Sequence, residues 1–348
     1  MKVTQRTVRL QLTEPLRISR STMAARDAVW LFVEHEGRTG RGEAVSSVYY
    51  GLDTGTLTRL LHAESLWLAR FAEPESALAE LRTASRRTPP AVRAAVESAL
   101  LDLTGKRAGL PVHELLGTPG PQSAATCRTI GIVPPDRAAA EAARLVRAGF
   151  TVLKIKAGAP DPEDDLTRVR AVRAAASCAR LLLDPNGAWS PDTAERLLPR
   201  LAQLGIEAVE QPVPPGDPEA LARLAQRSPL PVIADEDAIG YEDARRLAGR
   251  VQGINVKLAK CGGVTAALRI AELIEGTGTE LMLGCLTAST LGIAPAVHLA
   301  GRARWTDLDG HLLLAHDPWT GIGGADGTVR TSSRPGLGVR PRTEEAPR

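Results

Sequence analysis

The sequence predicts an α/β protein: a (β/α)8 barrel of the TIM type, with an N-terminal α+β capping domain that the C-terminal tail completes. Three observations predict this fold. From about residue 128, short apolar runs alternate with helical stretches rich in Ala, Leu and Arg, and eight such runs follow one another. The residues before them carry a different, mixed pattern. The length of 348 residues suits a barrel plus an accessory domain.

The N-terminal third has the pattern of a short antiparallel meander followed by helices. Apolar and polar residues alternate over 2–13 and over parts of 28–37, and the segment 36–44 supplies turn glycines. Helical patterns follow at 54–70, 74–84 and 90–109. The last of these has Pro near its start and Gly at its end, as helix boundaries prefer. We therefore expect residues 1–120 to form the capping domain, with loops that contribute to specificity.

The eight apolar runs predict the strands of the barrel. They are RTIGIV, TVLKIKAG, RLLLDPNG, IEAVEQP, LPVIADED, GINVKLAK, ELMLGCL and ARWTDLDG. Strands that alternate with helices form parallel sheets, and eight such units close into a barrel, which we expect at residues 121–317. Residues 318–348 are rich in Gly, Pro, Ser and Thr. We expect them to pack on the cap and to end in disorder.

The composition indicates which classes of partner the protein lacks and in which cellular compartment it is expected. Lys and Arg total 43 and Asp and Glu total 40, so the net charge of +3 is nearly balanced, and the arginines suit solvated helix faces better than a nucleic-acid surface. Aromatic residues make up only 3%, too few for base-stacking platforms. No signal peptide, 18-residue apolar run or Cys/His metal spacing is present. We expect a cytoplasmic protein without nucleic-acid or membrane partners and with free thiols.

The predicted strands end with polar and charged residues, whose burial costs free energy. Lys154 and Lys156 are two residues apart, so their side chains share one face of the second strand and repel each other unless anions compensate. The other strands end with Asp184, Asn186, Glu210, Asp235, Glu236, Lys257, Cys285, Asp307 and Asp309. Helix capping is the alternative for any single Asp, but capping does not account for lysines on two separated strands. The pattern predicts a charged rim at the carboxyl ends of the strands, where barrel enzymes place their active sites.

Three carboxylates on consecutive strands predict a metal site. Asp184, Glu210 and Asp235 end the third, fourth and fifth strands. Ligation by oxygen alone suits Mg²⁺ or Mn²⁺ and does not suit Zn²⁺, which favours His or Cys. Nearby lysines balance the excess negative charge and help to attract an anionic substrate.

The motifs KIK, DPNGAW, VEQP, ADED and NVKLAKCGG, in this order, resemble the enolase superfamily and its muconate-lactonizing-enzyme subgroup. The resemblance spans essentially the whole chain. It implies a bound Mg²⁺, with Mn²⁺ as the alternative, and places the metal ligands on Asp184, Glu210 and Asp235. It also implies that Lys156 and Lys257 are the two bases, with Lys154 as the partner of Lys156.

Two further motifs, MLGCLTAST at 282–290 and TDLDGHLLL at 306–314, resemble the dipeptide epimerases, the L-Ala-D/L-Glu epimerase group in particular. This resemblance implies that Asp307 and Asp309 bind the α-ammonium group of the substrate. Strand periodicity puts both carboxylates on one face, as a cation site needs. A helix cap after the eighth strand is the alternative interpretation of this pair.

The implied reaction is inversion at the α-carbon of the C-terminal residue of a dipeptide. Removal of the α-proton creates a dianionic enediolate, which a cation on the carboxylate stabilises. Lys156 and Lys257 lie on different sides of the barrel, so one neutral lysine takes the proton and the other, protonated, returns one to the opposite face. The charge of Lys154 is expected to lower the pKa of Lys156.

Specificity is expected from two segments of the cap, residues 16–26 and 45–52. Epimerases of this type hold the glutamate side chain with an arginine of the first loop, and that position falls on or near Met23. Three arginines lie close by, namely Arg17, Arg20 and Arg26. Two alternatives remain open: one of these arginines holds the substrate side chain in place of the expected one, or the preferred second residue of the dipeptide is uncharged. The residues expected to line the substrate pocket are Met23, Arg20, Tyr50 and Cys285.

Other interpretations of the same residues remain. The first is a related reaction: o-succinylbenzoate synthesis, N-acylamino acid racemisation or muconate cycloisomerisation. Asp307 and Asp309 argue against it, because those substrates lack a free α-ammonium group. The second is a barrel that binds without catalysis, although no metal ligand or lysine is missing. The identity of the dipeptide, its pathway and the oligomeric state, with a homo-oligomer as one alternative, are left open.

Overall fold

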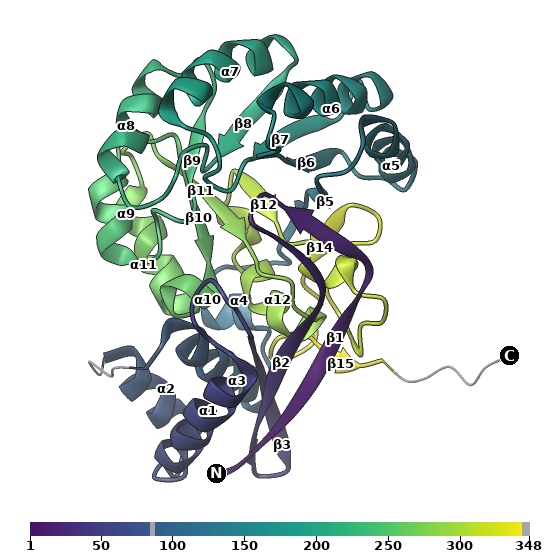
Figure 1. The fold of residues 1–348 in the computed structure, drawn as a ribbon. Coiled ribbons are helices and arrows are strands. Elements are labelled where there is room, and N and C mark those ends of the chain that lie inside the picture. The colour runs from purple at the N-terminus through teal and green to yellow at the C-terminus, as the bar shows by residue number, and fades with distance from the viewer. Residues whose placement is uncertain (84–87, 343–348) are drawn as a thin grey trace, which may run out of the picture.

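A computed structural model describes residues 1–83 and 88–342 of the chain. Figure 1 shows the barrel above the capping elements, with a long hairpin running between them. The disorder expected at the end of the chain falls on residues 343–348, outside the described part. No helix within the described ranges combines the length and the apolar character that crossing a membrane requires.

The N-terminal meander is confirmed as a sheet of β1 (Lys2–Ile18), β2 (Ser21–His35) and β3 (Arg38–Val45), all antiparallel. The segment 16–26, expected as a loop, is instead the paired end of the β1–β2 hairpin. Its pairing resumes at Leu16 opposite Met23, after an irregularity in the register. Pairing within the hairpin satisfies part of its backbone hydrogen-bonding groups. This end of the hairpin reaches the barrel mouth, where the amide of Ile132 donates to the carbonyl of Arg17 at 2.9 Å.

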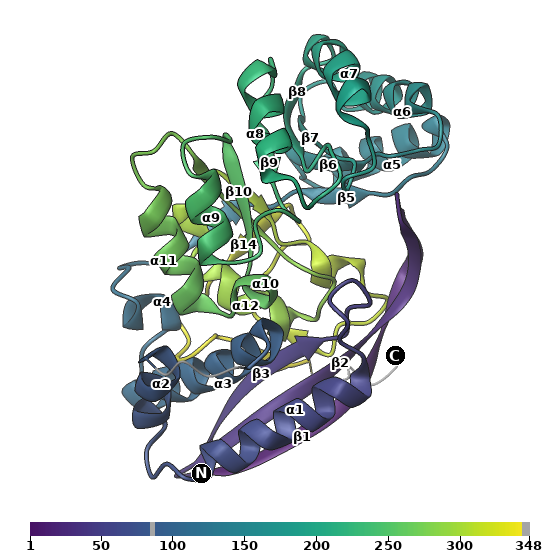
Figure 2. The ribbon, with the colours of Figure 1, turned by 60° about the vertical axis from the view of Figure 1, so that its left-hand side comes forward.

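The helices of the cap are α1 (Thr54–Leu68), α2 (Pro74–Thr83), α3 (Pro90–Ala108) and the short α4 (Val112–Leu115). Figure 2 shows α1 and α3 against the sheet of β1 to β3. Contact between α3 and β3 is close because β3 carries glycine where the helix backbone passes. A Cβ atom at Gly42 would lie 2.0 Å from the carbonyl oxygen of Ala95, so a side chain at Gly42 would push the helix away.

In the part of the chain that the structure describes, eight parallel strands form one sheet in the order β12-β11-β10-β9-β8-β7-β6-β5. The strands are β5 (Arg128–Ile130), β6 (Val152–Lys156), β7 (Arg180–Asp184), β8 (Ile206–Glu210), β9 (Val232–Ala234), β10 (Gly253–Lys257), β11 (Glu280–Gly284) and β12 (Trp305–Asp307). Each lies within one of the eight predicted runs. The helices after them are α5 (Pro135–Arg147), α6 (Pro162–Ala175), α7 (Pro191–Gln203), α8 (Pro218–Arg227), α9 (Tyr241–Leu247), α10 (Leu258–Cys261), α11 (Val264–Ile274) and α12 (Thr290–Val297).

The sheet curls so that its two edges meet. The amide of Cys127, just before β5, donates to the carbonyl of Thr306 in β12 at 2.9 Å. Inside the sheet, buried side chains from β6, β7, β8, β9, β11 and β12 and from the residue before β5 form a packed core separate from the larger one outside. Its members are Cys127, Val152, Leu182, Ala208, Ile233, Met282 and Trp305. The interior is therefore filled below the charged rim, as in a barrel enzyme.

The C-terminal segment runs back along the molecule through short strand pairs. These join β13 (Trp319–Thr320) to β15 (Arg340–Pro341), and β14 (Thr328–Arg330) to β4 (Ser123–Ala125). The segment also meets the capping helices: the amide of Leu337 donates to the carboxylate of Asp102 on α3 at 2.9 Å. The boundaries of the three predicted domains stay predictions.

A buried histidine pair predicts how stability depends on pH. His298, 1% exposed, accepts a hydrogen bond at Nδ1 from the amide of His113 at 3.1 Å, and its Nε2 lies 3.3 Å from the carbonyl of Leu337. These contacts require the neutral ring, with the proton on Nε2. Burial lowers the pKa of His298 from its usual 6.5 to about 4. The unfolded chain therefore binds the proton more readily, and stability is lost as the pH falls from about 6.5 toward about 4.

We expect the free energy of unfolding to fall between pH 7 and pH 5 by about 2 kcal/mol more in the parent protein than in His298→Gln. Denaturant titrations at the two pH values, run on both proteins, measure the difference. Equal pH dependence in the two proteins would show that His298 does not titrate in this way.

Candidate active site

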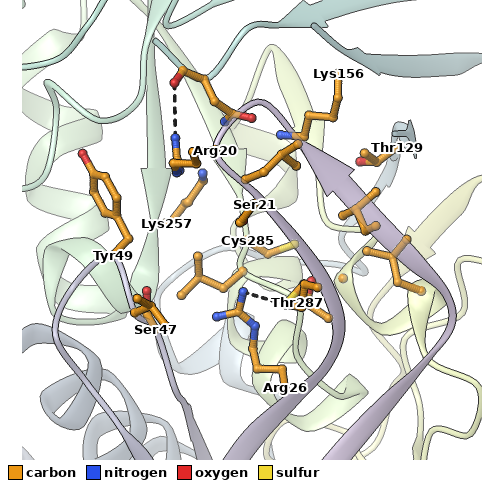
Figure 3. Close-up of a pocket in the computed structure, with 18 of the residues that line it drawn as sticks. Arg20, Ser21, Arg26, Ser47, Tyr49, Thr129, Lys156, Lys257, Cys285 and Thr287 are labelled. Carbon is orange, nitrogen blue, oxygen red and sulfur yellow. Dashed lines mark hydrogen bonds between the residues drawn. The ribbon is translucent and has the colours of Figure 1, made fainter. Parts of the chain in front are cut away.

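The carboxyl ends of the barrel strands open into a cavity of about 490 Å³. The end of the β1–β2 hairpin and residues 46–50 cover it from the cap side. Figure 3 shows Lys156 and Lys257 entering from the barrel, and Arg20, Arg26 and Tyr49 from the cap. The rim predicted from the strand ends therefore faces a cavity large enough for a small ligand.

Lys154 lies among three carboxylates of the charged rim. Its side chain is 2% exposed, and Nζ lies 2.6 Å from Glu210 Oε2, 2.7 Å from Asp307 Oδ2 and 3.0 Å from Asp184 Oδ2. Burial alone would lower the pKa of Lys154, but the three carboxylates raise it well above the usual value. The ammonium group of Lys154 is thus fixed in its charged form at neutral pH, and its expected influence on the pKa of Lys156 stays a prediction.

Lys156 and Lys257 lie on opposite sides of the barrel. Lys156 belongs to β6 and contacts the carboxylate of Asp184. Lys257 belongs to β10, and its Nζ lies 2.6 Å from Asp235 Oδ2 and 3.9 Å from Glu210 Oε1. Four steps in the strand order separate β6 from β10, which is half of an eight-stranded barrel. Burial opposes the charge of Lys257, but Asp235 and Glu210 together raise its pKa.

Asp184, Glu210 and Asp235 are buried side by side, with exposures of 0%, 2% and 2%. The two oxygens of Glu210 face different neighbours: Oε2 shares Lys154 with Asp184, and Oε1 faces Lys257 together with Asp235. Burial and the charge of Asp184 raise the pKa of Glu210 to about 7. Such crowding of negative charge is relieved by a cation among the carboxylates.

Several features of this cluster fit a hard divalent ion. The donors are carboxylate oxygens, the type that Mg²⁺ prefers. Two more buried oxygens nearby, Asn186 Oδ1 and Glu236 Oε2, have no hydrogen-bond partner among the described residues. Asn186 also has a φ of +50°, a strained conformation for a residue with a side chain. Within the described ranges, no group of three or more His, Cys, Asp or Glu side chains is already arranged to hold a metal ion; lysine nitrogens contact the oxygens of this cluster instead.

Asp307 and Asp309 both line the cavity and are 5% and 3% exposed. Asp307 contacts Lys154, while one oxygen of Asp309 accepts the amide of Thr129 at 2.7 Å and lies 3.3 Å from Arg128 Nη1. The alternative role as a helix cap finds no support for Asp309. It precedes the short 3₁₀ helix at residues Gly310–Leu313, but its side chain makes no capping bond to that helix.

The residues expected in the pocket all line the cavity, namely Met23, Arg20 and Tyr50 from the cap and Cys285 from the barrel. Arg20 is already paired: its Nη1 lies 2.7 Å from Glu236 Oε1, and its guanidinium stacks 4.6 Å from the ring of Tyr49. Arg20 therefore links the hairpin end to the barrel, and its charge is already paired with a carboxylate of the protein. Burial raises the pKa of the Cys285 thiol, which agrees with its interpretation as a wall residue.

Two buried residues that hold the carboxylates were not predicted from the sequence. The amide of Asn255 donates to Glu210 Oε1 at 2.7 Å, and Lys260 Nζ lies 2.5 Å from Asp235 Oδ1. Asn255 lies two residues before Lys257, so strand alternation could have placed it on the same face. Lys260 follows the strand in α10, and the pattern gives no comparable signal for its direction.

Replacing Arg20 with methionine tests its role in closing the cavity. We expect KM to rise by about 3- to 10-fold, with a smaller fall in kcat, because the ion pair to Glu236 holds the hairpin end over the mouth. Steady-state kinetics measure both constants. Arg17→Met is the matched control, since Arg17 is exposed on the same hairpin. Equal effects of the two substitutions would contradict this role.

Two family models match the chain. Residues 1–117 match the N-terminal domain of the mandelate racemase / muconate lactonizing enzyme family, and residues 137–346 match a model described as enolase C-terminal domain-like. Together they cover both the cap and the barrel.

Two curated relatives and one solved structure that resemble the chain are described as dipeptide epimerases. The chain is 33% identical to a hydrophobic dipeptide epimerase of Roseobacter litoralis, over 97% of this chain and 98% of the relative. It is 31% identical to an L-Ala-D/L-Glu epimerase of Bacteroides thetaiotaomicron, over 97% and 88% of the two chains. The dipeptide epimerase of Enterococcus faecalis, in complex with Mg and the dipeptide L-Leu-L-Tyr, superposes with a TM-score of 0.89 at 32% identity, over 97% and 98% of the chains. The relatives thus share a reaction and differ in the dipeptide.

Proposed function

This chain belongs to the mandelate racemase / muconate lactonizing enzyme family of the enolase superfamily, and on that premise we propose that its barrel mouth epimerises a dipeptide at the α-carbon of the C-terminal residue. The resemblance to dipeptide epimerases is confirmed by the relatives that share it. The protein is accordingly an isomerase that acts on dipeptides. The roles of its individual residues are our proposal.

The position of two lysines on opposite sides of one cavity carries the proposal. Lys156 on β6 and Lys257 on β10 both line the cavity, half a barrel apart. A carbon atom held between them exposes one face to each amine. Inversion needs this arrangement, because the proton must leave from one face and arrive at the other.

The remaining groups orient a dipeptide between the lysines. We assign Asp184, Glu210 and Asp235 as the ligands of Mg²⁺, and we expect Mn²⁺ to substitute for it. When bound, the metal ion neutralises charge that develops on the substrate carboxylate as the α-proton leaves. Asp307 and Asp309 hold the free α-ammonium group at the opposite end of the substrate, where both carboxylates line the cavity.

The proton transfers then follow from the two amines. The lysine that faces the α-hydrogen takes it in its neutral form, and the lysine on the other side gives a proton in its charged form. Reaction of the opposite epimer exchanges these roles. Arg20 and the hairpin end limit the access of water to the cavity during the transfer.

A comparison of free and N-succinylated dipeptides tests this assignment against N-acylamino acid racemisation. We expect a free L,L-dipeptide to be epimerised and its N-succinyl derivative to be turned over at least about 10²-fold more slowly, because succinylation removes the charge that Asp307 and Asp309 require. The rate of formation of the second diastereomer is measured for both compounds by chromatography. Faster turnover of the acylated compound would favour the alternative reaction and overturn the assignment.

A further inference from the structure

Arg26 is a cavity cation whose contacts leave its charge unmatched. It lies on β2 and points toward Cys285 and Thr287 in Figure 3. Its Nη1 donates to the carbonyl of Ser46, and its Nη2 lies 3.1 Å from the sulfur of Met23, a weak acceptor. Its Nε is shielded from solvent and has no hydrogen-bond partner in the described part of the chain.

The other cations that line the cavity differ from Arg26 in one respect. Each of them forms an ion pair with a carboxylate: Arg9, Arg20, Lys154, Lys156 and Lys257. No ion pair within the described ranges includes Arg26. Burial also lowers the pKa of Arg26, in agreement with a charge that lacks a partner. An anionic group of a ligand would supply what the protein does not, and the planar guanidinium suits a carboxylate.

The position of Arg26 indicates which part of a dipeptide would carry that anion. Arg26, on the cap side, points toward Cys285 (Figure 3). On the barrel side, Gly310 directly follows Asp309, and a Cβ atom on Gly310 would lie 3.1 Å from the sulfur of Cys285. Cys285 follows β11, which neighbours β12 in the sheet. Arg26 is therefore next to the proposed ammonium site, and the two reacting lysines come from β6 and β10.

We propose that Arg26 binds the side-chain carboxylate of the N-terminal residue, so that the enzyme prefers dipeptides that begin with Asp or Glu. This inference rests on the proposed function, since it takes Asp307 and Asp309 as the ammonium site. An acidic N-terminal residue carries an ammonium group and a carboxylate a few bonds apart. The two acids of the barrel and the guanidinium of the cap would bind these charges together.

Isosteric substrate pairs test the preference. In the parent protein we expect kcat/KM for L-Glu-L-Leu to exceed that for L-Gln-L-Leu by at least about tenfold. In Arg26→Met the two values should become equal, through loss of the acidic substrate alone, and Arg26→Lys should restore part of the preference. Arg9→Met is the matched control: it removes a cavity-edge arginine that is already paired with Asp27 and should keep the preference.

Four results would overturn the inference. If Arg26→Met slows the turnover of both substrates equally, the side chain only links β2 to Ser46 through its hydrogen bond. A preference in the second pair, L-Ala-L-Glu over L-Ala-L-Gln, that Arg26→Met removes would assign Arg26 to the C-terminal residue. Neutral dipeptides turned over as fast as acidic ones would refute this inference and leave the proposed function standing, whereas no α-hydrogen exchange in any dipeptide would refute both.

Discussion

Lys156→Ala and Lys257→Ala are each expected to lose about 10²- to 10⁴-fold in the rate of epimerisation. Each variant should still exchange the α-hydrogen of one epimer with D₂O, namely the epimer whose hydrogen faces the lysine that remains. The two variants should therefore retain exchange for opposite epimers. The physical reason is their position: the amines approach from β6 and β10, half a barrel apart.

The loss of the α-hydrogen signal is followed by ¹H NMR for the L,L and L,D dipeptides separately. The rate at which the two epimers interconvert is measured in parallel. Lys2→Ala serves as the control, because Lys2 is exposed in the cap and pairs only with Glu34 among the described residues. Exchange of the same epimer by both variants would place both amines on one face of the substrate. Unchanged epimerisation in either variant would remove that lysine from the mechanism.

Glu210→Gln should weaken Mg²⁺ binding and lower kcat/KM by at least about 10²-fold each. The substitution keeps the size of the side chain and removes the charge between Asp184 and Asp235. Isothermal titration with MgCl₂ measures the affinity, and thermal unfolding of the metal-free variant checks that the barrel still folds.

Glu207→Gln is the matched control for this substitution. Glu207 lies on the same strand, three residues earlier, and contacts Arg180 and Trp305 away from the cavity. We expect its Mg²⁺ affinity and activity to stay within about twofold of the parent, because surface charges of this kind have small effects. Normal Mg²⁺ binding in Glu210→Gln would contradict the assignment of Glu210 as a ligand.

The barrel and much of its rim were predictable because they depend on local patterns. Each strand falls in an apolar run bounded by helical sequence, and the rim charges lie at or next to the carboxyl ends of their strands. Alternation was enough to place Lys154 and Lys156 on one face. The ordered motifs then identified the family, which the relatives confirm.

Contacts between distant segments could not be predicted in the same way. Arg20 meets Glu236 across 216 positions of the chain, and no pattern around either residue predicts the partner. The register of the hairpin end depends on an irregularity after Gln11, where pairing resumes at Leu16. Lys154 was expected to act on Lys156, but its contact with Asp307 follows from the closure of the barrel, which brings β12 beside β5.

The most direct test of a metal-dependent two-base epimerase is solvent exchange by the unmodified protein. A library of free L,L-dipeptides is incubated with the protein and Mg²⁺ in D₂O, and the diastereomers are separated and analysed by mass spectrometry. We predict that the new diastereomer carries one deuterium at the α-carbon of its C-terminal residue, and that EDTA prevents its formation. A new diastereomer that keeps its original hydrogen, or an active protein that is indifferent to EDTA, would contradict the mechanism.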